Sequence, residues 1–133
     1  MSTLKNFLNP VRKENIKFTL SDAFVDDEGR PLEWEMRQIG AREGTEIAKE
    51  TAELSGVESM TAYVAAALVT PNLKSIELVN AFAEKHNGKI LTPAEILMEL
   101  VTDGELGRLI EVYNRHNRAA GRFEDLEKEA KNS

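Results

Sequence analysis

The spacing of apolar residues changes once along this chain, at Gly40. Before that residue, apolar and polar side chains alternate in two short segments, 16–20 and 32–36. After it, apolar residues recur at intervals of three and four positions through the rest of the patterned chain. Alternation is typical of half-buried β-strands, and the wider spacing is typical of amphipathic helices. The sequence therefore predicts a mainly α fold of the α+β class, in which an N-terminal β-hairpin is followed by about five helices in one compact domain.

The two alternating segments form the arms of the predicted hairpin, residues 16–38. Between them lies Asp26-Asp27-Glu28-Gly29-Arg30-Pro31, whose aspartates and glycine favour a turn and whose proline resists a helix. If the apolar residues of both arms share one face, paired positions must keep the same parity, for example Leu20 with Trp34 and Phe18 with Met36. An isolated hairpin is marginally stable in water, so we expect this face to pack on the helices.

Glycine and proline bound the first two predicted helices. The first spans 41–54 and stops at Gly56. The second runs from about Ser59 to near Thr70, because Pro71 disfavours a helical residue before it. The residues expected to face inward are Ile47, Thr51 and Leu54 in the first helix, and Met60, Tyr63, Val64, Ala67 and Leu68 in the second.

Capping residues bound the remaining three. Ser75 caps the third helix, which stops at Asn87-Gly88. Thr92-Pro93-Ala94-Glu95 is a full capping-box signature and opens the fourth. Asp103-Gly104 interrupts the chain before the last helix, 105–121. The residues expected to face inward are Ile76, Val79, Phe82 and Ala83, then Ile96, Leu97, Leu100 and Val101, and finally Leu106, Leu109, Ile110 and Tyr113.

The length of 133 residues is typical of one domain. We expect an N-terminal segment (1–13), a single globular domain (14–122) and a charged tail (123–133), without an internal repeat or linker. The first twenty residues lack a secretory apolar core. The longest uninterrupted apolar stretch, Tyr63–Val69, is far shorter than the roughly 20 residues of a membrane span. These features predict a soluble protein without a membrane partner.

Charge and cysteine usage exclude several function classes. Acidic residues number 23 against 17 basic ones, a net charge of -6, which disfavours nucleic acid and anionic membranes as partners. The chain has no cysteine, so disulfides, thiol nucleophiles and cysteine zinc sites are ruled out. This composition fits a reducing, cytoplasmic compartment.

No catalytic constellation stands out in the sequence. His86 and His116 are the only histidines, and each is expected at the surface without a second metal ligand at suitable spacing. The acidic cluster 26–28 is expected to be a solvated turn, and Glu33 and Glu35 lie on the polar face of a strand. We therefore expect neither an enzyme nor a metal or cofactor site.

Two features are candidate partner surfaces. One is the N-terminal apolar cluster of Leu4, Phe7 and Leu8, which either docks on the chain's own core or contacts another chain. The other lies opposite the apolar stripe of the last helix, within roughly 80° of arc, and favours an acidic protein surface over DNA. Its members are Arg108, Arg115, Arg118 and Arg122, and the alternative is an ordinary solvated helix face.

The order of several short motifs from Leu4 to Asn117 resembles the XkdN-like tail assembly chaperones of tailed phages and defective prophages. Two features depart from the family pattern: the longer 83–91 connection and Leu106, where the family has an aromatic residue. The motifs are Leu4-Lys5-Asn6-Phe7-Leu8, Ser21-Asp22-Ala23-Phe24, the Gly29 turn, Trp34 through Ile39, Glu43, Thr70-Pro71-Asn72-Leu73-Lys74 with Glu77-Leu78, and Gly104-Glu105 followed by Leu109.

This resemblance implies a non-enzymatic assembly factor of the bacterial host cytoplasm. It would bind the tape-measure protein, keep it soluble, help recruit the tail tube protein and be absent from the mature tail. Families of this kind commonly make a longer form by ribosomal frameshifting, and Ala130-Lys131-Asn132 can be encoded by a slippery A AAA AAC.

Two other functions stay open at this point: a structural tail component that remains in the virion, and a helical nucleic-acid-binding regulator that uses the arginine helix. A homo-oligomer is also open, with Tyr63 or Trp34 at the contact.

Overall fold

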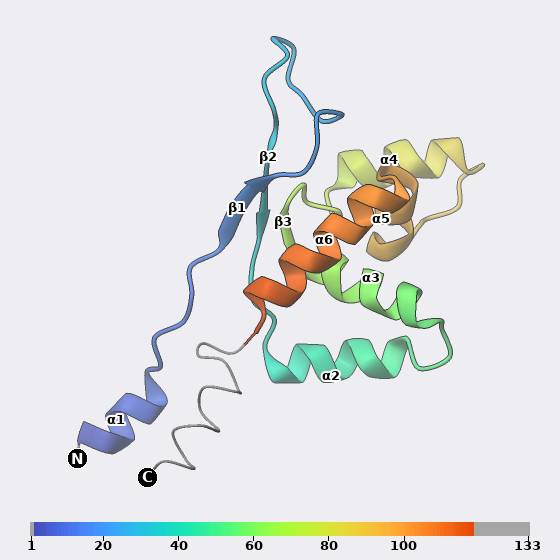
Figure 1. Cartoon of the computed structure of the whole chain (residues 1–133). Helices are drawn as coiled ribbons and strands as arrows, with labels where there is room; N and C mark the ends of the chain where they lie inside the picture. Colours follow the sequence, from blue (N-terminus) through green and yellow to red (C-terminus); the bar gives the residue numbers. More distant parts are fainter. Residues whose placement is uncertain (1, 119–133) are drawn as a thin grey trace.

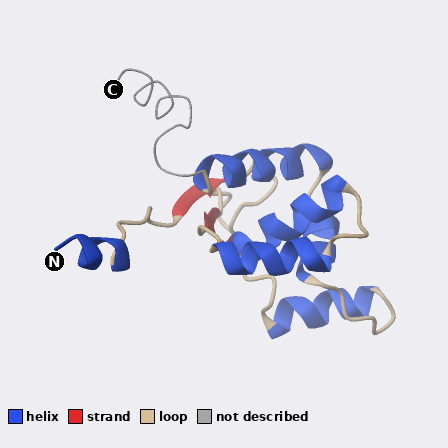
Figure 2. Ribbon diagram, turned by 90° about the horizontal axis from the view of Figure 1, so that it is seen from below, coloured by secondary structure: helices blue, strands red, loops and turns tan. Residues whose placement is uncertain are grey.

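The computed structural model describes residues 2–118. It confirms the predicted fold class, with six helices and three strands in this part of the chain (Figure 1). Figure 2 shows the same arrangement from below, with a small sheet beside a helical body. In chain order the elements are α1 (Ser2–Leu8), β1 (Ile16–Thr19), β2 (Glu33–Met36), α2 (Ala41–Glu50), α3 (Gly56–Ala67), β3 (Leu68–Thr70), α4 (Ile76–Lys85), α5 (Pro93–Leu100) and α6 (Asp103–His116).

The hairpin has the predicted parity but different partners. Phe18 lies opposite Trp34, and Met36 lies opposite Ile16. The predicted pairs Phe18 with Met36 and Leu20 with Trp34 are therefore wrong by two positions. Parity survives a slip of two residues, which is why the apolar side chains still share a face.

A bulge in the first arm accounts for this slip. Beyond β1 and β2, a bridge joins Val25 to Pro31, so residues 20–24 lie opposite Leu32 alone. The bulge turns Leu20 into the core at 1% exposure. It also sets the ring of Phe24 edge-on to Trp34, at 5.1 Å between centroids. Two additional apolar side chains thus contact the body from a short hairpin.

The third strand, β3, was not predicted. The helix expected to reach Thr70 ends at Ala67, and the chain continues as a strand antiparallel to β2, with Leu68 opposite Met36. The backbone N–H of Arg37 donates to the Ala67 carbonyl at 2.9 Å, which extends this pairing. Leu68 remains buried as predicted, although in a strand. Pairing with β2 satisfies the backbone beyond α3, which local spacing does not reveal.

Several helix ends differ from the predicted ones. Gly56, predicted as a stop, is the first residue of α3, because Ser55 caps that helix by accepting the N–H of Glu58. Asp103-Gly104 lies in the first turn of α6, because Thr102 and Glu105 form a second capping box. α2 ends four residues before Leu54, which is 49% exposed rather than inward-facing.

Other predicted boundaries are confirmed. The Ser75 side chain accepts the N–H of Leu78, and Thr92 forms the predicted capping box. Asn87 and Gly88 both have positive φ where α4 ends, and the N–H of Gly88 donates to the Ala83 carbonyl at 2.8 Å.

One apolar cluster joins the sheet to the helices. It contains Trp34 and Met36 of β2, Val64 of α3, Leu97 of α5 and Leu109 of α6, each at most 2% exposed. Ile76 was expected to face inward but is 78% exposed. No helix in residues 2–118 is both long and apolar enough to cross a bilayer.

Candidate interaction surfaces

Helix α1 lies away from the body of the molecule, and Figures 1 and 2 agree on this from perpendicular directions. Its apolar side chains are largely in solvent: Leu4 is 67% exposed, Phe7 80% and Leu8 70%. Asn9 ends the helix, since its backbone and side-chain N–H groups both donate to the Lys5 carbonyl. Of the two predicted arrangements, docking on the chain's own core is therefore wrong.

Lys13 fixes the chain between α1 and β1 to the end of α6. Its Nζ donates to the carbonyls of Arg118 at 3.2 Å and His116 at 3.4 Å. Basic side chains stabilise a helix C-terminus, because the last carbonyls are unpaired and carry partial negative charge. The segment that follows α1 is thus fixed to the end of α6, while α1 itself is not packed on the body.

The predicted arginines of the last helix do not form one uniform face. Arg108 donates from Nη1 to the Leu20 carbonyl at 2.7 Å, so it supports the hairpin bulge. Arg115 pairs with Glu111 at 3.5 Å, and both side chains are about 70% exposed. The Arg118 carbonyl accepts from Lys13, and Arg122 lies outside the described residues.

A hollow of about 210 Å³ opens between β1 and α6. Phe18 and Val112 supply its apolar wall, while Arg108, Arg115 and Glu111 carry the charges around it. This hollow was not predicted from the sequence. The arginines are visible in the sequence, but nothing in local spacing shows that α6 and β1 line one hollow.

Ser21 and Glu105 hold α6 in that position. The Ser21 hydroxyl donates to the Glu105 carboxylate, whose other oxygen accepts the N–H of Thr102 at 2.9 Å. These hydrogen bonds, with the one from Ser21 first, keep the pKa of Glu105 below its ordinary value. A hairpin residue and a helix cap therefore share one carboxylate.

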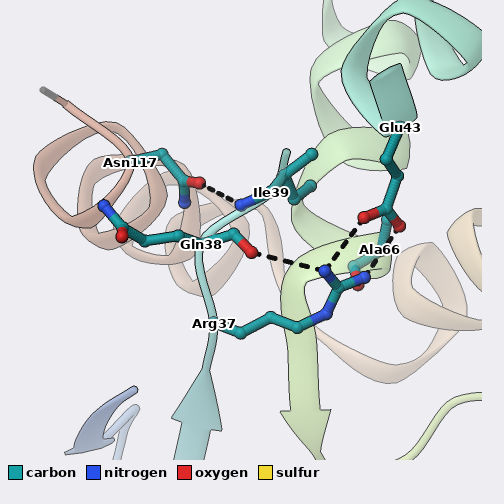
Figure 3. A network of polar contacts seen from close by, with 6 residues as sticks. All are labelled: Arg37, Gln38, Ile39, Glu43, Ala66 and Asn117. Carbon is teal, nitrogen blue, oxygen red and sulfur yellow. Dashed lines mark hydrogen bonds and ion pairs between the residues drawn. The ribbon is translucent and has the colours of Figure 1, made fainter. Parts of the chain in front are cut away.

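A polar junction ties the end of β2 to the helices (Figure 3). The guanidinium of Arg37 binds the Glu43 carboxylate with two hydrogen bonds, of 2.9 and 2.7 Å, and also donates to the Ala66 carbonyl. The N–H of Ile39 donates to the Asn117 side chain at 2.7 Å. The hydrogen bonds between Arg37 and Glu43 lower the pKa of Glu43 and raise that of Arg37. Arg37 and Asn117 hold backbone groups and Glu43 holds Arg37, so the junction is structural.

His116 is buried, at 6% exposure, which corrects the surface position predicted for it. Burial, followed by the charge of Lys13, lowers the pKa of His116. Its Nε2 has no hydrogen-bond partner among the described residues. His86 is half-buried, and its Nε2 lies 3.6 Å from Glu99. No group of three histidine, aspartate or glutamate side chains in residues 2–118 is placed to hold a metal ion.

The two aromatic residues named for a homo-oligomer contact lie in different environments. Trp34 is 2% exposed and belongs to the core, so its assignment to a partner contact is wrong. Tyr63 is half-buried and donates to the Gly44 carbonyl at 3.0 Å.

Comparison with known proteins supports the fold. No protein-family model matches the chain, and no curated protein matches it. Among solved structures, the chain is similar to the crystal structure of the protein YqbN, a structural genomics target, with a TM-score of 0.67 and 21% sequence identity. The match covers 81% of this chain and 87% of YqbN. The chain therefore shares the fold of YqbN.

Proposed function

We propose that the protein is a phage tail assembly chaperone that binds the tape-measure protein and promotes assembly of the tail tube. The observation that carries this proposal is the exposed apolar face of α1, formed by Leu4, Phe7 and Leu8. A helix that exposes most of its apolar surface needs a partner, and a helical client with apolar stripes is such a partner. The resemblance to XkdN-like chaperones supplies the identity of the client.

The location of α1 suits a binding role. Residues 9–15 connect it to β1, and its apolar side chains are 67–80% exposed. A client can therefore bind α1 without opening the core. We propose that the chaperone acts non-enzymatically in the host cytoplasm and is displaced before the tail is complete.

Co-expression with the tape-measure protein encoded in the neighbouring gene tests this role. The wild-type chain should keep the client in the soluble fraction, and a variant with Leu4, Phe7 and Leu8 all changed to Ala should lose most of that effect. The matched control changes three apolar residues of similar exposure on the body, Val57, Ile76 and Ile90, to Ala. If the α1 variant solubilises the client as well as the control does, α1 is not the client site.

Mass spectrometry of purified tails tests displacement. A chaperone is absent from the finished particle, whereas a structural tail component is present in fixed proportion to the tube protein. Detection in that proportion would assign the chain to the structural class instead.

A further inference from the structure

The outer edge of β1 is open. The sheet has the order β1-β2-β3, so β1 pairs with β2 on one side and faces no strand on the other in the described part of the chain. An unpaired strand edge presents backbone N–H and C=O groups that can pair with an added strand. This makes the edge a surface for extended peptides rather than for helices.

Helix α6 lies across one face of the sheet and lines a hollow together with β1 (Figure 1). Lys13 contacts the last turn of α6 and the residues after it, while Ser21 contacts the first turn, so β1 and α6 run side by side in opposite directions. The hollow of about 210 Å³ lies between them, against Phe18 and Val112. An added strand would therefore meet both backbone groups and a place for a side chain.

The charge at this edge favours an acidic partner. Two arginines, Arg108 and Arg115, and one acidic residue, Glu111, line the hollow, although the whole chain carries a net charge of -6. The Arg115 side chain is 73% exposed, and its partner Glu111 is equally accessible. Exposed ion pairs of this kind are weak, so an incoming carboxylate can replace Glu111 at Arg115.

We propose that this edge binds an extended acidic segment of a partner protein, which adds as a strand beside β1. One apolar side chain of the segment enters the hollow next to Phe18 and Val112, and a carboxylate two positions along, on the same face of the added strand, pairs with Arg115. The backbone supplies affinity, and the hollow with its arginines supplies selectivity.

The same charges disfavour a second copy of this chain as the occupant. Pairing of β1 with β1 about a two-fold axis would bring Arg108 and Arg115 of both copies to one edge. Like charges so placed destabilise an interface. A partner strand that carries acidic and apolar residues on the face toward α6 meets no such repulsion.

The inference rests on the proposed function only for the natural identity of the partner, because a model peptide tests the surface by itself. The probe is a fluorescent peptide of about eight residues, a length that covers a typical strand. Threonine alternates in it with valine or glutamate, so that one valine and its flanking glutamates lie on the same face. Its matched control replaces every glutamate with lysine. Binding to the full chain is followed by fluorescence anisotropy at low and at high salt.

We expect the acidic peptide to bind, the lysine peptide to bind more weakly, and added salt to weaken the acidic complex. Glu111→Gln should tighten binding and Arg115→Glu should weaken it, each by about fivefold, as expected for one exposed charge contact. Arg42→Glu, at an exposed position on α2 away from the hollow, is the matched control and should change nothing.

Backbone pairing has its own signature. Two peptides are compared, one N-methylated at the odd-numbered residues and one at the even-numbered residues. One of them should lose binding and the other should keep it, because only every second N–H of an added strand faces β1. The proposal would be overturned if both methylated peptides behaved alike, or if the lysine peptide bound as tightly as the acidic one. A concentration-dependent dimer through β1 in sedimentation would also overturn it. If the peptide binds as expected while Arg115→Glu still solubilises the tape-measure protein, the edge stands but serves another partner. If peptide binding fails while α1 still solubilises the client, only this inference falls.

Discussion

Arg37 binds both carboxylate oxygens of Glu43, at 2.9 and 2.7 Å, and thereby joins the end of the sheet to the first turn of α2. The same guanidinium donates to the carbonyl of Ala66, near the end of α3. Two consecutive elements, β2 and α2, and the later helix α3 therefore meet at one planar side chain. A guanidinium can make these contacts together because its N–H groups point in fixed directions within one plane.

Arg37→Lys should lower the free energy of unfolding by about 1 kcal/mol, because lysine keeps the charge but cannot form the paired hydrogen bonds. The effect is modest because both side chains of the pair are more than a third exposed to solvent. Urea denaturation measures it, with Arg42→Lys as the control at an exposed position of α2. Equal stability of the two variants would mean that the junction contributes nothing.

His116 makes stability depend on pH. Burial lowers its pKa below the ordinary value of 6.5. Below pH 6.5 this histidine is therefore protonated more fully in the unfolded chain than in the folded one, which favours unfolding. Stability should therefore fall as the pH is lowered from 6.5 towards the depressed pKa, and this loss should be absent above 6.5. In His116→Leu that loss should disappear, whereas in the control His86→Gln it should remain. Urea denaturation at a series of pH values between neutral and mildly acidic measures both.

Truncation of an apolar side chain should destabilise the protein only where that side chain is buried. Leu97→Ala should lower the free energy of unfolding by about 3 kcal/mol, since Leu97 is fully buried and truncation leaves a cavity. Ile76→Ala should cost less than about 0.5 kcal/mol, because that side chain is 78% exposed. Thermal or urea unfolding of the two variants side by side provides the measurement. A comparable loss in Ile76→Ala would place it in the core, as the helical spacing alone predicted.

These differences show what a single sequence reveals about the fold. The caps at Ser75 and Thr92 were predicted because each depends on side chains within three residues of the helix start. The strand at Leu68 was missed because its pairing partner, Met36, lies more than thirty positions earlier in the chain. The period of apolar residues also cannot distinguish a helix that continues from one that ends in a buried strand.

The candidate surfaces also divide into features that depend on near neighbours in sequence and features that depend on distant ones. The apolar cluster of α1 was visible in the sequence, because Leu4, Phe7 and Leu8 are close neighbours along the chain. The hollow beside Phe18 was not, since it forms only when α6 lies along β1. His116 was placed at the surface because its charged neighbours in sequence are exposed, while the segments that bury it come from elsewhere in the chain.

Helix α6 offers a test of its own boundary. Gly104 and Gly107 both lie within α6, and a methyl group added at either would meet no atom within 4 Å. Gly107→Ala should therefore raise the free energy of unfolding by about 0.5–1 kcal/mol, because alanine loses less backbone entropy than glycine in a helix. Gly104→Ala should also stabilise, by a smaller amount, since it lies in the first turn. If Gly104→Ala destabilises the protein, Gly104 would instead lie in a turn before the helix, as the sequence predicted.

The last prediction concerns α1 and separates a docked helix from a free one. Changing Leu4, Phe7 and Leu8 together to Ala should alter the free energy of unfolding by less than about 0.5 kcal/mol, because these side chains bury little surface on the folded body. Urea denaturation followed by Trp34 fluorescence measures it, since that side chain lies in the core. The three substitutions should also lower the tendency of the chain to associate through apolar contacts, which sedimentation velocity reports. A loss of about 2 kcal/mol or more, as expected for truncating a packed apolar face, would mean that α1 docks on the body in solution, and any partner that binds its apolar face would first have to displace it.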